Sequence, residues 1–117
     1  MKIFIVIVSI LILLFLMVGL TCCQSSVNEI YNKGVDYGVQ GEFEKAKKEF
    51  ENALTIDPSY EPAASCLRLA NTVINQKIEK ETGIYLFKGI TYSNESKLDQ
   101  AISEYSKAIK INPEFDE

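Results

Sequence analysis

One pattern of glycines, alanines and aromatic residues occurs twice in this chain, and it constrains the fold more than any other feature. Residues of the same type, or one aromatic ring in place of another, recur at a single offset, so chance is a poor explanation. The first copy consists of Gly34, Tyr37, Ala46, Phe50, Ala53 and Pro58, and the second of Gly89, Tyr92, Ala101, Tyr105, Ala108 and Pro113. The chain is therefore built from two similar units.

The spacing within each copy predicts two closely packed helices. Steps of three and four residues place Ala46 and Phe50 on one helical face. We expect Gly34 and Ala46 to meet where the helices cross, because they present almost no side chain, and Tyr37 and Phe50 to fill the space beside them. Pro58 lacks an amide hydrogen and disfavours helix before it, so it ends the second helix.

This pattern resembles the tetratricopeptide repeat, whose unit is a helix-turn-helix of about 34 residues. The resemblance covers roughly residues 27–58 and residues 82–113. In that family the matching positions pack the helices together. The resemblance therefore implies a protein-interaction scaffold whose repeated residues carry no chemistry of their own.

The predicted fold class is all-α, with residues 24–117 forming the repeat domain. Hairpins are expected at about 27–57 and 82–113, with a single helix at about 60–80 between them. An N-terminal apolar helix precedes the repeats, and the first repeat helix is expected to begin at the capping box formed by Ser26 and Glu29.

The break between the middle helix and the next one is expected at Thr82-Gly83. One continuous helix through Ser93 is the alternative, because only one weak breaker stands there. Cys66 lies within the apolar stripe of the middle helix, so we expect a buried packing cysteine.

Residues 1–23 read as a signal peptide or membrane anchor. Lys2 is followed by an apolar run from Ile3 to Leu20, which fits either a secretory signal core or a short membrane-crossing helix. Leu20-Thr21-Cys22-Cys23 resembles a bacterial lipoprotein box. That resemblance implies acylation of Cys23 at the mature N-terminus, with Cys22 as the alternative acceptor. An uncleaved anchor and a conventional signal peptide remain open.

The charges around this segment predict its orientation. Lys2 lies on the N-terminal side of the apolar run, and the first charge after it is Glu29. Positive charge tends to stay in the cytoplasm. We therefore expect the rest of the chain in the cell envelope, outside the cytoplasm and anchored to a membrane.

Composition argues against several functions. With 117 residues the chain is one small domain. Its net charge of -4 disfavours nucleic acid as a partner, since nucleic acid requires a positive surface. The chain has no histidine, and therefore no imidazole base or His metal ligand. We expect no enzyme, no metal site, no cofactor and no small-molecule substrate.

Binding of another protein is the function that the composition leaves open. In tetratricopeptide arrays the first helix of each hairpin lines a concave groove, which here implies an apolar partner groove made by Tyr31, Val35 and Val39 from the first copy and by Leu86 and Ile90 from the second. The alternative is that the unpaired middle helix buries these residues as core, leaving a structural, degenerate repeat protein. We also expect apolar surface on the last hairpin, and hence a protein partner or self-association.

Overall fold

The structure is a computed structural model that describes the backbone of residues 1–113 and the side chains of residues 1–14 and 26–113. These residues form five α-helices and no strand, which confirms the predicted all-α class. The helices are α1 (Lys2–Val39), α2 (Phe43–Ile56), α3 (Glu61–Ile74), α4 (Lys80–Asn94) and α5 (Leu98–Ile111).

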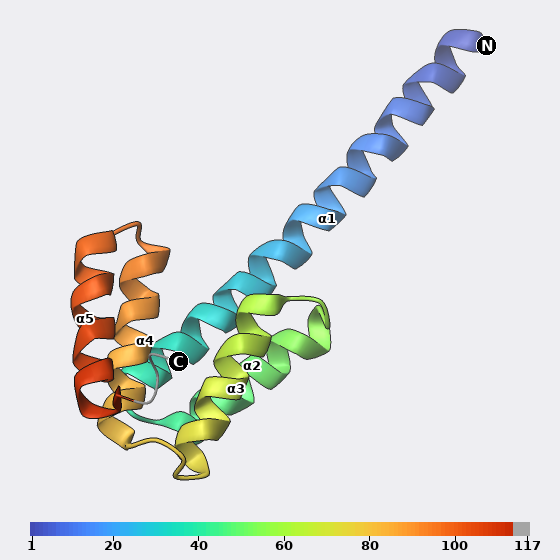
Figure 1. Ribbon diagram of the computed structural model, residues 1–117. Helices are drawn as coiled ribbons and strands as arrows, with labels where there is room; N and C mark the ends of the chain where they lie inside the picture. The colour runs from blue at the N-terminus through green and yellow to red at the C-terminus, as the bar shows by residue number, and fades with distance from the viewer. Residues whose placement is uncertain (114–117) are drawn as a thin grey trace.

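Four helices gather around the C-terminal part of α1, whose N-terminal part projects away from them (Figure 1). The pairs α1 with α2 and α4 with α5 are antiparallel hairpins, and α3 packs on α2. Besides its own partner α5, α4 packs chiefly against α1 and contacts α3 little. The second hairpin is thus seated on the first helix of the chain, and the molecule measures 71 × 29 × 25 Å.

The N-terminal segment is continuous with the first repeat helix. A separate apolar helix, with a new helix starting at Ser26, was predicted, whereas α1 begins at Lys2 and runs through Ser26 to Val39. The sequence contains no proline or glycine between Leu20 and Asn32 that would end the helix. The capping box therefore forms no helix start. The side chains of Cys22 and Cys23 lie outside the described residues.

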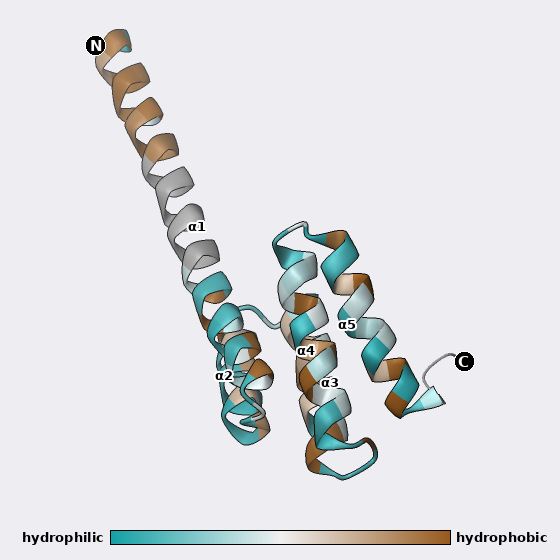
Figure 2. Ribbon diagram, turned by 90° about the vertical axis from the view of Figure 1, so that its left-hand side faces the viewer, coloured by the Kyte–Doolittle hydropathy of each residue, from teal (hydrophilic) through white to brown (hydrophobic). Residues whose placement is uncertain are grey.

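The first turns of α1 are apolar and exposed. Between Ile3 and Leu14 the large apolar side chains are 39% to 77% exposed, and Figure 2 shows them as a brown band at the free end of α1. Within the part of the chain that the structure describes, no helix has both the length and the apolar character needed to cross a membrane.

The middle helix is shorter than predicted, because the break falls before Thr82-Gly83. Helix α3 ends at Ile74, and Gln76 adopts a left-handed backbone with φ of 57°, a conformation that commonly terminates helices. Gly83 lies inside α4, where a Cβ would stand 2.6 Å from Cγ2 of Val73. Close packing against α3, and not a chain break, explains this glycine.

In each hairpin, a glycine of the first helix packs against an aromatic ring of the second helix. A Cβ at Gly34 would lie 2.6 Å from Cε1 of Phe50, and one at Gly89 would overlap the ring of Tyr105. The nearest side chain to each glycine is thus the ring of the facing helix. The four repeated alanines are also buried, at most 3% exposed: Ala46, Ala53, Ala101 and Ala108.

The remaining repeated residues lie at the edges of the hairpins. Tyr37 and Tyr92 are half-buried, and lysine side chains lie over both rings, with Lys45 Nζ 5.5 Å from the Tyr37 centroid and Lys97 Nζ 6.0 Å from the Tyr92 centroid. Pro58 and Pro113 follow the C-terminal ends of α2 and α5. Proline suits this place because it cannot continue a helix.

Candidate protein-interaction surfaces

The residues predicted to line an apolar groove do not form an open surface. Tyr31 is 7% exposed and Val35 is 3% exposed, so both belong to the core. Val39, Leu86 and Ile90 are half-buried and pack against that core. The physical reason is the packing of the other helices on α1: the Tyr31 ring contacts Phe50 of α2 and Tyr60 beside α3, and α4 packs on α1 near Val35. The chain itself therefore covers the predicted groove, with α2, α3 and α4 all contributing.

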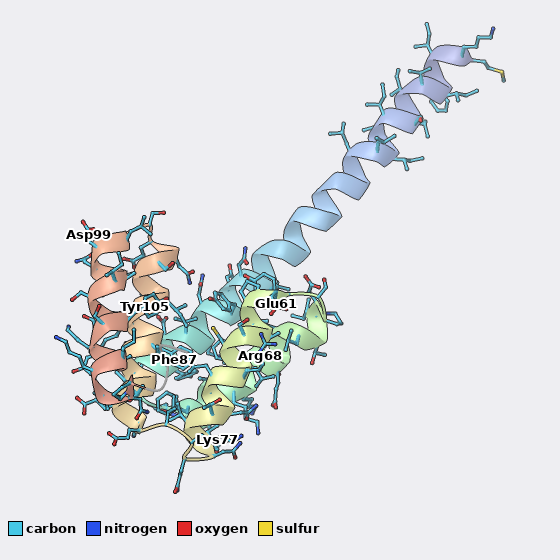
Figure 3. The ribbon with its side chains drawn as sticks, in the orientation of Figure 1. Glu61, Arg68, Lys77, Phe87, Asp99 and Tyr105 are labelled. Atoms are coloured by element: carbon cyan, nitrogen blue, oxygen red, sulfur yellow. The ribbon has the colours of Figure 1, made fainter. Side chains whose placement is uncertain are left out.

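Phe87 of α4 is the residue that joins the two hairpins, and Figure 3 labels it where α4 meets α1. Its side chain is fully buried. The ring stacks on Phe50 of α2, with centroids 6.0 Å apart and an interplanar angle of 7°. Gly38 of α1 makes room for it, because a Cβ there would overlap the Phe87 ring.

The Phe87 contact between the two hairpins was not predicted from the sequence. Phe87 corresponds in the first copy to Asn32, so a search for residues shared by both copies passes over it. The available signal was Gly38, a helical glycine outside the repeated pattern. A glycine within a helix lowers its stability unless close packing requires it.

The hydroxyl group of the buried Tyr31 forms hydrogen bonds to two other helices. Its hydroxyl accepts a hydrogen bond from Asn94 Nδ2 of α4 at 3.4 Å and from Cys66 Sγ of α3 at 3.9 Å. Burial, the largest cause, raises the pKa of Tyr31 to about 12 and that of Cys66 to about 11. Both groups are therefore neutral at physiological pH, and Cys66 is the buried cysteine of the apolar stripe, 4% exposed.

A polar cleft of about 310 Å³ opens between α1 and α4, next to the covered groove. We call it the α1–α4 cleft, and its lining residues are Asn32, Val35, Asp36, Thr91, Asn94 and Glu95. The lining contains two carboxylates and no basic side chain, although Lys97 Nζ lies 2.7 Å from Glu95 Oε2. Such a lining suits groups that donate hydrogen bonds or carry positive charge.

A second surface, on α5, is apolar. Its outward residues are Leu98, Ile102 and Ile109, which we call the α5 stripe, and they are 64%, 62% and 37% exposed. Steps of four and seven residues align them along one side of the helix. Among the described helices α5 packs against α4 alone, so no described helix covers the stripe.

The described residues offer binding contacts and no metal centre. Nowhere among them do three His, Cys, Asp or Glu side chains gather closely enough to hold a metal ion. What the two surfaces supply is hydrogen-bond acceptors in the cleft and apolar contact along α5. Helical hairpins packed in this way, with such surfaces, define the class of helical-repeat interaction scaffolds.

Comparison with protein families matches residues 27–60 and residues 82–115 to the tetratricopeptide repeat. The two matches together span more than half of the chain, and they coincide with the two repeats found in the sequence. The chain therefore belongs to the tetratricopeptide repeat family, as predicted, and protein–protein interaction is its class of function. No curated protein and no solved structure matches it.

Proposed function

We propose that the protein is a non-catalytic interaction scaffold held at a membrane surface by residues 1–23, with its repeats on the non-cytoplasmic side. The observation that carries this proposal is the exposed apolar segment from Ile3 to Leu14, which is continuous through α1 with the first repeat. Apolar side chains exposed over a whole segment are stabilised by a lipid surface or by another protein. An attachment at this segment would bring the repeats to that surface.

The favoured form of the tether is a lipid on Cys23, with Cys22 as the alternative acceptor. Support comes from the sequence: a single basic residue before the apolar run, and the Leu20-Thr21-Cys22-Cys23 box after it. A signal cleaved before an acylated cysteine would remove the apolar segment and leave the lipid chains as the anchor. An uncleaved segment would itself hold the protein at the membrane.

Mass spectrometry of the N-terminal peptide, isolated from the membranes of the native host, tests the tether. The expected result is a diacylated or triacylated peptide beginning at Cys23. Replacing Cys23 with Ser should then abolish both the lipid and the cleavage. A mature chain that begins at Met1 and carries no lipid would contradict the lipoprotein form, and recovery of that chain from the soluble fraction would contradict any tether.

The surface proposed to receive the partner is the α1–α4 cleft. Asp36 and Asn32 are exposed on α1, and with Asn94 of α4 they present acceptors to a peptide that carries basic or amide groups. Charge-assisted hydrogen bonds to Asp36 would give such a peptide its register. The side chains that would orient the bound peptide come from two different hairpins, so peptide binding depends on the contact between α4 and α1.

Site-specific photo-crosslinking tests this surface. A photoreactive residue at Asn32 should capture a protein in native membranes, and Asp36→Ala should reduce that capture at least several-fold. Glu51→Ala, which removes an exposed acid on α2, is the matched control and should leave capture unchanged. Equal capture by both variants would show that the cleft is not the binding surface.

A structural role, without any partner, is the second candidate. The burial of Tyr31 and Val35 favours it, because the chain fills its own apolar groove. If neither the cleft nor any other exposed position yields a crosslinked protein in native membranes, this second candidate replaces the first. Tyr31→Ser cannot separate the two, since it removes a core ring and changes stability under both.

A further inference from the structure

The two copies of the repeat differ in what covers their second helices. Helix α5 corresponds to α2, so Leu98 stands at the position of Phe43. Phe43 is 7% exposed, whereas Leu98 is 64% exposed. The Phe43 ring is covered by α4, through Gly83 and Phe87, and α3 also packs on α2. No described helix packs against the outer side of α5.

The other members of the stripe show the same contrast. Ile102 corresponds to the half-buried Lys47, so the exposed copy is the more apolar of the two at this position. Ile109 corresponds to the half-buried Leu54. Solvent alone would favour polar residues on an outer helix face. In the first copy this face of the helix is an interface. In the second copy two of its positions stay apolar and the third has become apolar, which indicates that another helix packs against α5 as well.

The spacing of the stripe specifies the kind of helix. Leu98, Ile102, Tyr105 and Ile109 are separated by steps of four, three and four, which is the spacing of core positions in a two-helix seam. Tyr105 is half-buried against Gly89 and borders the stripe on its hairpin side. A helix with the same spacing would fit this seam.

The charges beside the stripe select the partner helix and its direction. Asp99 stands near the N-terminal end of α5 and Lys110 near the C-terminal end, both exposed and both on the same flank. Figure 3 labels Asp99 at the N-terminal end of α5. In an antiparallel pair of identical helices, each Asp99 would face the partner's Lys110, twice by symmetry. A parallel pair would set like charges against each other.

We propose that two copies of this chain associate through the α5 stripe, with their α5 helices antiparallel about a two-fold axis. The helix dipoles then also oppose each other favourably. The α5 stripe consists of three residues, far fewer than the about 20–30 per partner of a standard stable interface, so the association is weak and reversible. On a membrane, under the proposed function, confinement of the copies would raise their effective concentration.

Carbodiimide crosslinking of the full chain in lipid vesicles tests the arrangement, because this reagent joins a carboxylate directly to an amine. Eleven residues of helix separate Asp99 from Lys110 by about 16 Å at ~1.5 Å per residue, so a direct bond between them within one chain is excluded. The expected product is a covalent dimer whose digest contains Asp99 linked to Lys110. Its yield should fall at least several-fold in Ile102→Ser.

Charge reversal tests the direction. Asp99→Lys alone and Lys110→Asp alone should each reduce the dimer, since each places like charges opposite one another. The double variant Asp99→Lys/Lys110→Asp should restore it and yield the reversed crosslink. A parallel pair would behave differently, because the double variant would keep the like-charge contacts of the unchanged protein.

Ile56→Ser, which changes an exposed isoleucine of α2 in the same way, is the control and should leave the yield unchanged. Three results would each overturn the proposal: no Asp99–Lys110 crosslink, a dimer that depends on Ile56 and not on Ile102, or crosslinking of α5 to a different protein in native membranes. A chain that stays monomeric but still captures a partner at Asn32 would overturn this inference and leave the proposed function standing.

Discussion

At the scale of single residues, Phe87 decides how the two hairpins meet. It is fully buried between α4, α1 and α2, and stacks on Phe50. Phe87→Ala should lower the free energy of unfolding by about 3–5 kcal/mol, because it removes a buried ring and leaves a cavity. Chemical denaturation followed by circular dichroism measures this. Leu86→Ala, at the half-buried neighbour, is the control and should cost less; equal losses would contradict the role of Phe87.

Gly38 should be coupled to Phe87. Gly38→Ala places a methyl group where the Phe87 ring lies, and overpacking of this kind costs about 1–3 kcal/mol. In the Phe87→Ala background the ring is gone, so the same substitution should cost far less. A double-mutant cycle measures the difference. Additive losses would show that the two residues do not touch.

Cys66 and Tyr31 should make the protein less stable at alkaline pH. Burial raises the pKa of Cys66 from 9.0 to about 11 and that of Tyr31 from 10.0 to about 12. Above about pH 9 the unfolded chain loses the Cys66 proton while the folded chain keeps it, so the free energy of unfolding falls as pH rises. Denaturation at about pH 8 and about pH 10 measures the slope.

Cys66→Ala is the control for this pH dependence. It should flatten the decline between pH 9 and pH 11, whatever its effect on stability at neutral pH. Tyr31→Phe should act in the same way, but at the higher pH where Tyr31 titrates. An unchanged slope in Cys66→Ala would mean that the thiol is not shielded from solvent as the structure has it.

The sequence predicted these residues unevenly. Packing positions that occur in both copies could be predicted from the sequence, because the same contact is encoded twice, as Gly34 with Phe50 and as Gly89 with Tyr105. The Phe87 contact with Gly38 occurs once, between residues far apart in the chain. Tyr31 and Val35 were predicted to be groove residues from their place on the first repeat helix. Their burial depends on how α2, α3 and α4 pack on α1, which helical periodicity alone does not encode.

At the scale of the helices, the turn between α4 and α5 is strained at Ser96. This residue has a φ of 60°, and its counterpart in the first copy is Gly41, with a φ of 76°. Left-handed backbone costs a residue with a side chain about 1 kcal/mol relative to glycine. Ser96→Gly should therefore raise the free energy of unfolding by about 0.5–1 kcal/mol, measured by chemical denaturation.

The matched control for this turn is Gly41→Ser, which should destabilise by a similar or larger amount. A Cβ at Gly41 would also lie 2.9 Å from Cε of Lys80, which adds crowding to the strain. Loss of stability in Ser96→Gly would contradict the left-handed conformation. It would favour instead a capping role for the Ser96 hydroxyl at the start of α5, where the structure forms no side-chain cap hydrogen bond.

The ends of the helices were less predictable than their existence. All repeat helices were expected from periodicity, yet the break after α3 falls at Gln76 and not at Thr82-Gly83. A glutamine in left-handed backbone has no sequence signature, whereas Gly83 looked like a breaker and serves packing. Likewise, Ser26 and Glu29 match a capping box, but a helix that arrives from Lys2 leaves that box unused.

At the scale of the whole molecule, the second hairpin docks on α1 and does not simply follow α3 in a linear stack. The repeats predicted the family and the two hairpins, but not this placement. A contact between distant helices depends on shape fit across the core, here the Phe87 ring against Gly38 and Phe50. The same docking creates the α1–α4 cleft and leaves the α5 stripe uncovered.

Nuclear magnetic resonance of the full chain in detergent tests this docking most directly. The structure predicts nuclear Overhauser contacts between the Phe50 and Phe87 rings and an upfield shift of a Gly38 Hα proton, which faces the Phe87 ring. Contacts between Gly89 and Tyr105, within the second hairpin, serve as the internal reference. If the reference contacts are present and those from Phe87 to Phe50 and Gly38 are missing, the hairpins are folded but not joined in this way, and the account of the cleft fails with them.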